Sequence, residues 1–150
     1  MTYTYSKVRH LELLRRFLDL KKHGKDLYTK NRDEYLELLH YRGRLEDHAF
    51  WKSREQFVLL MENFIHDSID MEQFEITFSR LWRETFKADN VFQMDLKRVK
   101  NLQLDPRSDG FGSFVTFVYR QFEVLEDEDC TEQEVKDIVR DVLREIQPYL

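Results

Sequence analysis

Histidine and cysteine are the residue types in this chain best suited to bind a metal or to attack a substrate, and their spacing supports neither role. The five histidines are His10, His23, His40, His48 and His66. A zinc site usually shows two histidines one helical turn apart, or a close pair of cysteines. No two of these histidines have that spacing, and the chain has a single cysteine. The sequence therefore predicts no metal site and no cofactor.

That cysteine, Cys130, lies in an acidic environment that makes it a poor nucleophile. The acidic run 126–129 precedes it, and Glu132 follows it. Nearby negative charge raises the pKa of a thiol and disfavours the thiolate, which is the reactive form. A single cysteine also cannot form an internal disulfide, so secretion into an oxidising compartment gains no support. We predict an inert thiol.

The acidic run has the first spacing of a calcium-binding loop but not the rest of it. Asp127 and Asp129 stand at the first and third places of such a loop. The loop then needs Gly at its sixth place and Glu at its twelfth. Those places hold Glu132 and Ile138. A loose, weak cation site stays open as an alternative, and we favour a solvated turn.

Other signatures of catalysis are missing from the sequence. The segment Asp109-Gly110-Phe111-Gly112-Ser113 has two glycines near a helix start. A phosphate-binding loop is longer, normally follows a strand and carries a Lys or Arg near the phosphate. No Gly-x-Ser-x-Gly elbow is present for acyl transfer. Carboxylates are plentiful, but nothing in the sequence places two of them together in a dry pocket. We predict that the chain is not an enzyme.

Charge is distributed unevenly along the chain. Residues 1–54 carry 13 Lys and Arg against 8 Asp and Glu, whereas residues 121–150 carry 3 against 10. Such asymmetry can steer binding partners and says little about the fold. An acidic C-terminal region repels nucleic acid and attracts a basic surface. The basic N-terminal region could contact an acidic partner or lie against the acidic part of the same molecule.

The elements that must position these residues are predicted to be helices. The 150 residues include only 4 Gly and 2 Pro, fewer than strands joined by tight turns need. The clearest helix spans 131–146, because its apolar residues recur at helical spacing and Thr131 with Glu134 forms a capping box. Pro148 ends it. The length suits a single domain.

Three further helices precede this one. The first carries Phe57 to Ile65, and a short joint at 66–69 makes it an antiparallel neighbour of the next. That next helix opens at Asp70, a good N-cap, and its apolar face runs to Thr85 or Phe86. Another starts after Gly110 and continues to about Leu125. Between these two helices we expect a short helix within 91–104 and a loop at 104–110.

The first part of the chain predicts two more helices. One ends at the basic, glycine-containing segment 21–25, and a more polar one carries Tyr35, Leu38, Leu39 and Leu45. The resulting prediction is an all-α single domain spanning 1–150. It consists of an antiparallel four-helix bundle core at 55–150 and an N-terminal helical extension at 1–54.

From about Phe57 onward, the order of features resembles the bacterial colicin-like immunity proteins, including the colicin D type. The shared pattern covers roughly residues 57–147. The residues that carry it are Phe64-Ile65, Ile69, Phe74-Glu75, Leu81-Trp82, Phe114, Phe117, Gln121-Phe122-Glu123, the acidic link 126–129 and the capped helix 131–146. Where the colicin D type carries an acid one turn before Glu123, this chain has Arg120.

This resemblance implies a four-helix bundle that blocks a toxic nuclease by presenting carboxylates to its basic substrate-binding cleft. Such charge complementarity raises both association rate and affinity. The implied partner-binding surface consists of Glu123, Glu126, Asp127, Glu128 and Asp129. The expected partner is a protein, either a basic nuclease-like domain or the subunits of an assembly.

The alternative is a structural or adaptor subunit of a larger macromolecular assembly. Its support is the basic, aromatic N-terminal arm, since Arg and Tyr are frequent at interface centres. This arm contains Tyr3, Tyr5, Lys7, Arg9, Arg15 and Arg16. An RNA-binding role for the same arm is weaker, because acids interrupt its bases and no RNA-binding signature is present. We expect no direct nucleic-acid contact, no membrane association, and a cytoplasmic location or the interior of an organelle.

Overall fold

The computed structural model describes residues 3–126 and 130–150, and all of their regular structure is helical. The α-helices are α1 (Lys7–Lys22), α2 (Leu27–Lys30), α3 (Arg32–Lys52), α4 (Arg54–Ile65), α5 (Met71–Met94), α6 (Phe111–Glu126) and α7 (Glu132–Ile146). Short 3-10 turns are η1 (Leu96–Arg98), η2 (Pro106–Ser108) and η3 (Gln147–Tyr149). The all-α prediction is confirmed. Within these residues, every helix is too short or too polar to cross a bilayer.

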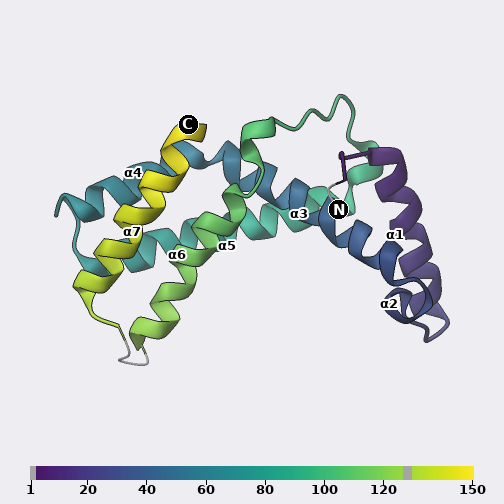
Figure 1. Ribbon diagram of the computed structural model, residues 1–150, viewed down its shortest axis with the longest axis horizontal. Coiled ribbons are helices and arrows are strands. Elements are labelled where there is room, and N and C mark those ends of the chain that lie inside the picture. Colours follow the sequence, from purple (N-terminus) through teal and green to yellow (C-terminus); the bar gives the residue numbers. More distant parts are fainter. Residues whose placement is uncertain (1–2, 127–129) are drawn as a thin grey trace.

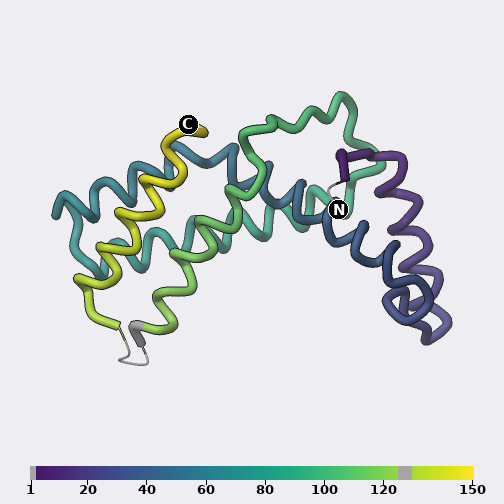
Figure 2. Tube along the Cα trace, viewed as in Figure 1, coloured from purple at the N-terminus to yellow at the C-terminus, as the bar shows by residue number. Residues whose placement is uncertain are grey.

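The molecule is elongated, with a group of helices at each end (Figure 1). One end contains α4, α6 and α7, and the other contains α1 and α2. The long helices α3 and α5 run through the middle and contact each other. The path of the chain in Figure 2 shows that the segment between α5 and α6 passes over the top of this middle region.

The larger hydrophobic core lies at the end formed by α4, α5, α6 and α7 and is rich in phenylalanine. Phe64 of α4 stacks on Phe74 of α5, with 4.2 Å between the ring centres. Helix α4 contacts α5 and α7, and α6 contacts the same two helices. Phe50 and Trp51 of α3 belong to this core too. The finer prediction of a four-helix bundle at 55–150 therefore stays a prediction, since α3 also shares the core.

A second, smaller core joins the N-terminal helices. Leu13 of α1, Leu27 of α2, and Leu38 and Tyr41 of α3 are buried together. Helix α3 therefore contributes its first half to this small core and its last turns to the large one. The described residues thus form two apolar clusters connected by one continuous helix.

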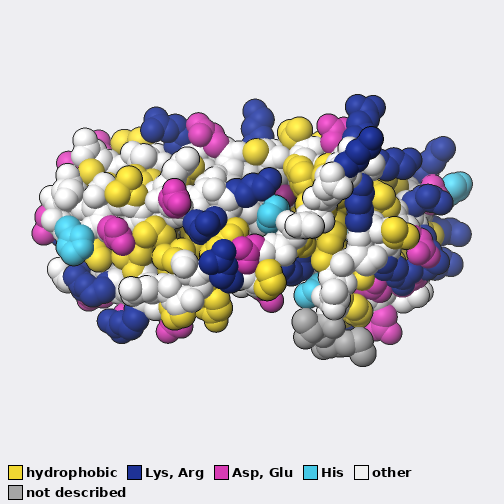
Figure 3. Space-filling model, turned by 90° about the horizontal axis from the view of Figure 1, so that it is seen from above, with side chains coloured by type: hydrophobic (Ala, Val, Ile, Leu, Met, Phe, Trp, Pro, Cys, Tyr) yellow, Lys and Arg dark blue, Asp and Glu magenta, His cyan; other side chains and the backbone are white. Residues whose placement is uncertain are grey.

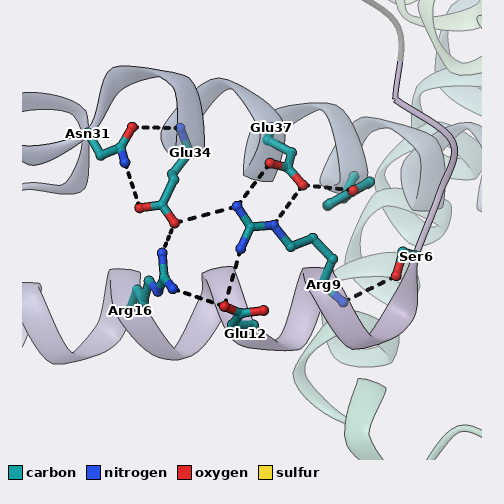
Figure 4. Close-up of polar contacts among 8 residues, drawn as sticks. Ser6, Arg9, Glu12, Arg16, Asn31, Glu34 and Glu37 are labelled. Atoms are coloured by element: carbon teal, nitrogen blue, oxygen red, sulfur yellow. Dashed lines mark hydrogen bonds and ion pairs between the residues drawn. The ribbon is translucent and has the colours of Figure 1, made fainter.

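Ion pairs also fix α1 against α3 (Figure 4). The Arg9 guanidinium donates to both carboxylate oxygens of Glu37, at 2.9 and 3.2 Å, and lies 3.5 Å from Glu34. Arg16 pairs with Glu34 and Glu12. The excess positive charge of the N-terminal region is thus partly neutralised by acids of the same region, and these pairs do not involve the acidic C-terminal region.

The predicted N-cap residues are confirmed at the starts of α5 and α7. The Asp70 carboxylate accepts a hydrogen bond from the backbone N–H of Gln73 at 2.8 Å, as an N-cap does. The Thr131 hydroxyl accepts one from the N–H of Glu134 at 3.2 Å. The Glu134 carboxylate, however, lies 3.3 Å from the Thr131 hydroxyl, so the second half of the expected capping box is a contact between side chains.

The expected separate helix within 91–104 was wrong. Helix α5 continues without a break to Met94, because residues 87–94 contain no Gly or Pro to stop it. Only the 3-10 turn η1 follows, and it buries Leu96. The expected loop at 104–110 includes the short turn η2. The one-turn helix α2 was not predicted.

Candidate functional site

The predicted acidic surface falls only partly within the described residues. Glu123 lies exposed on α6, and Glu126 is the last residue of that helix. Asp127, Glu128 and Asp129 lie outside the described residues. Glu123 is therefore the one member of the set whose side-chain surroundings can be stated.

Glu123 lines a polar groove of about 340 Å³ between α5 and α6. Arg83 lines the same groove, so the groove carries a positive as well as a negative side chain. Nearby, Tyr119 stacks on Trp82 with 4.1 Å between ring centres. The Trp82 indole N–H donates to the Thr116 hydroxyl at 3.0 Å. These contacts hold α5 against α6 and make this face an ordered, mixed-charge surface.

A more apolar groove lies between α6 and α7, which run beside each other in Figure 1. It has a volume of about 590 Å³. Its walls include Phe114 and Phe117 of α6 and Ile138 and Val142 of α7. Half of the Phe117 side chain is exposed (50%). A half-exposed phenylalanine in an apolar groove is a feature of binding surfaces.

Carboxylates border this groove along α7. Asp141 and Glu145 line it, and Asp137 stands one turn earlier on the same helix. Residues four positions apart lie on one helix face, so the three form an acidic row beside the apolar walls. Sequence reasoning placed the partner surface on the acidic link instead. The signal it missed is the spacing of four between Asp137, Asp141 and Glu145.

The charges of the acidic row are only partly paired within the protein. Arg140 donates to Asp137 at 3.1 Å, and Arg144 lies 3.5 Å from Asp141. Both pairs are exposed, and exposed pairs of this kind contribute only about 0–1 kcal/mol. Among the described residues, none forms an ion pair with Glu145. The row can therefore exchange its weak internal pairs for contacts with another molecule.

The two helices that form the groove are anchored from beneath. Helix α7 buries Val135, Val139, Val142 and Ile146 against the large core, which leaves its acidic row outward. The start of α6 is held by Asp47 of α3. Its two carboxylate oxygens accept from the backbone N–H of Gly110 at 2.8 Å and of Gly112 at 2.9 Å. A carboxylate from α3 thus caps α6, where anions are favoured by the helix dipole.

This cap requires a glycine at position 112. A Cβ added there would lie 2.8 Å from Asp47 Oδ1 and 3.4 Å from a ring carbon of Phe50. Burial raises the pKa of Asp47, and the two N–H groups and Arg44 oppose that rise. The two glycines of the segment 109–113 therefore serve helix capping and close packing.

The candidate reactive groups remain dispersed. Throughout residues 3–126 and 130–150, the structure brings together no group of three or more His, Cys, Asp and Glu side chains able to hold a metal ion. The pKa of the Cys130 thiol is raised by burial and by Glu134. That direction agrees with the direction expected from nearby negative charge, and Glu134 is the acid among the described residues that contributes to it.

Comparison of the chain with models of protein families, with curated proteins and with solved structures finds no match. The resemblance to colicin-like immunity proteins therefore stays a prediction.

Proposed function

We propose that the protein is a non-catalytic binding module that holds a basic, partly apolar segment of a partner protein in the groove between α6 and α7. The observation that carries the proposal is the combination of the half-exposed Phe117 in an apolar groove with the acidic row Asp137, Asp141 and Glu145 along its edge. Apolar side chains of the partner would cover Phe117, and its Lys or Arg residues would contact the row.

Charge complementarity supports a basic partner over an acidic one. Residues 121–150 carry ten acids and three bases, and the acidic row is part of them. Lys and Arg side chains gather instead at the end formed by α1 and α2, on the right in the view of Figure 3. A basic partner would therefore be steered toward the α6–α7 end and away from the other.

The resemblance to immunity proteins suggests what kind of partner this is. A nuclease cleft built to hold phosphates is positively charged, and carboxylates on rigid helices can substitute for those phosphates. A small basic nuclease domain is thus the partner class we favour. Within the proposal, Glu123, which is exposed in the neighbouring groove between α5 and α6, would supply a separate acidic contact.

A defined probe tests the groove directly. Two amphipathic helical peptides of equal length, one with Leu and Lys and the other with Leu and Glu, are titrated into the labelled full-length protein and followed by backbone NMR. We expect only the Lys peptide to shift resonances of α6 and α7, with an affinity that falls as salt rises. Equal binding of both peptides, or shifts confined to other helices, would refute the proposal.

Matched charge reversals locate the contact. Glu145→Lys changes the acidic row, and Glu62→Lys makes the same change at an exposed position on α4. The first should weaken binding of the Lys peptide about tenfold or more, and the second should leave it unchanged. The same pair of variants can then be used to recover natural partners. A basic nuclease domain retained by Glu62→Lys but lost by Glu145→Lys in low salt would match the favoured partner class.

The alternative, an adaptor subunit, has its own supporting observation. Val8 and Leu18 of α1 are 79% and 53% exposed, among basic side chains. Such apolar exposure on a helix is typical of an assembly surface. Leu18→Glu in the full-length chain should abolish recovery of salt-resistant subunits if this alternative holds. The same variant should have no effect on the binding of the Lys peptide to the α6–α7 groove.

A further inference from the structure

A cavity unrelated to the α6–α7 groove lies between α3 and α5, beside the start of α4. Its volume is about 470 Å³, within the range of small-molecule sites. Leu45 and Ala49 of α3 and Leu81 and Phe92 of α5 supply apolar walls. Figure 1 shows the two long helices running together through this middle region. The cavity is large enough for a compact organic molecule.

One wall carries a buried carboxyl group with an unused acceptor. Asp89 is only 2% exposed. Its Oδ2 accepts a hydrogen bond from the Gln93 side-chain amide at 2.9 Å. Its Oδ1 is buried and accepts no hydrogen bond from any described residue. Buried polar atoms almost always have partners, so an unpartnered carboxylate oxygen beside a cavity points to a ligand.

No positive side chain compensates this carboxyl. Asp89 forms no ion pair with any Lys, Arg or His of the described residues. Burial raises its pKa to about 6, with the Gln93 hydrogen bond opposing the rise. Burial raises the pKa of Glu46, and the negative charges of Asp89 and Asp47 raise it further. The region therefore has an excess of negative charge in a poorly solvated place.

A second wall presents another unpartnered polar atom. His48 of α3 lines the cavity, and its buried Nδ1 has no hydrogen-bond partner among the described residues. Burial lowers the pKa of His48, and the positive charges of Lys52 and Arg44 lower it further. The ring is therefore neutral near pH 7, and its Nδ1 can act as a hydrogen-bond donor or acceptor, according to the tautomer.

We infer that this cavity binds a small organic amine, with its apolar body against Leu81 and Phe92 and its ammonium group donating to Asp89 Oδ1. An ammonium group supplies both the missing donor and the missing positive charge. An anion would be repelled by Asp89, Glu46 and the Glu84 that also lines the cavity. A neutral hydrocarbon would fill the walls but leave the carboxyl unpartnered, which is costly in a buried place.

Entry of the amine requires movement at the rim, because Asp89 Oδ1 is covered. The Lys52 ammonium lies 5.7 Å from the centre of the Phe92 ring, and both residues line the cavity. Lys52 is exposed and has a long flexible side chain. Its rotation away from Phe92 would widen the rim of the cavity and move a positive charge away from an incoming amine. The ring of a phenylalkylamine could then pack against Phe92 in the place left by the Lys52 ammonium.

The test uses two probes of nearly equal shape, 2-phenylethylamine and 2-phenylethanol, with the full-length protein at pH 7.5. Backbone NMR shifts locate binding, and calorimetry gives affinity. We expect the amine to bind at least about tenfold more tightly than the alcohol and to shift resonances of α3 and α5 around Asp89 and His48. Equal affinity of amine and alcohol, or amine shifts confined to other surfaces, would overturn the inference without any variant.

Two variants on one helix complete the experiment. Asp89→Asn should reduce the affinity for the amine about tenfold or more and leave that for the alcohol little changed. Asp95→Asn makes the same change at the exposed C-cap of α5 and should change neither. Retained amine binding in Asp89→Asn would overturn the inference. The site shares no lining residue with the α6–α7 groove, so failure of one proposal leaves the other standing.

Discussion

The replacement Asp89→Asn should change how the stability of the protein depends on pH. Asp89 is buried, and its pKa is raised from an ordinary 3.8 to about 6. Below pH 4 the carboxyl is protonated in both the folded and the unfolded chain, so ionisation has no effect on stability. Between pH 4 and 6 the unfolded chain loses this proton while the folded protein keeps it. The free energy of unfolding therefore falls as pH rises through this window, and it levels off above pH 6.

The size of the effect follows from the size of the pKa shift. A shift of one pKa unit corresponds to about 1.4 kcal/mol, so a rise of about 2 units costs the folded wild-type protein about 3 kcal/mol above pH 6. Asparagine cannot ionise and escapes this loss. Its amide N–H₂ can replace Oδ1 as an unpartnered group, at a cost of about 1–3 kcal/mol that does not vary with pH. The pH dependence thus isolates the ionisation from the change of shape.

The measurement is urea unfolding of the wild-type protein and the variant at pH 4, 5, 6 and 8. We expect the stability of Asp89→Asn relative to wild type to rise by about 3 kcal/mol between pH 4 and pH 8. Glu46 and Asp47 also have raised pKa values, but both are present in each protein, so most of their contribution cancels. Asp95→Asn should give a profile parallel to wild type. A parallel profile for Asp89→Asn would refute the argument that Asp89 is a poorly solvated, uncompensated carboxyl.

Two substitutions and one measurement of thiol reactivity test other parts of the structure. Gly112→Ala should destabilise the protein by about 1–3 kcal/mol in urea unfolding, because the added Cβ would lie 2.8 Å from Asp47 Oδ1. This loss should exceed the gain from alanine as the better helix former. A stabilised variant would contradict the α6 cap. Glu37→Gln weakens the contact with Arg9 and should lower the free energy of unfolding by about 1 kcal/mol. Amide hydrogen exchange should become faster in α1 but not in α7. Cys130 should react with a thiol reagent at pH 7.5 more slowly than free cysteine, because its pKa is raised, and equal rates would count against that shift.

The helices themselves could be predicted because their signals are local. Apolar spacing and a capping residue located the starts of α5 and α7, and both caps are present as hydrogen bonds. The end of α5 could not be predicted in the same way. A helix without Gly or Pro stops where tertiary contacts stop it, and burial of Leu96 in the following turn is such a contact.

The arrangement of helices depends on pairs of residues far apart in sequence, which no periodicity reveals. Asp47 and Gly112 are 65 positions apart, and only the folded chain shows that one caps the helix of the other. The place of Phe50 in the large core is hidden for the same reason, since α3 reads as a polar helix. The acidic row on α7 was readable from a spacing of four, but its value as a surface depends on Phe117 lying half exposed beside it.

Asp47 is partly buried and Asp89 is buried, and their different partners show why one is assigned to structure and the other to binding. Both Asp47 and Asp89 have raised pKa values caused first by burial. Asp47 receives two backbone N–H groups and lies 3.9 Å from Arg44, so its partners belong to the fold. Asp89 receives one side-chain amide, and its other oxygen has no partner within the described part of the chain. A protein gains no stability from such a group, since an apolar residue of similar size would avoid the cost of burying it. The presence of Asp89 beside a cavity of suitable size is therefore better explained by a ligand that supplies the missing donor than by the demands of folding.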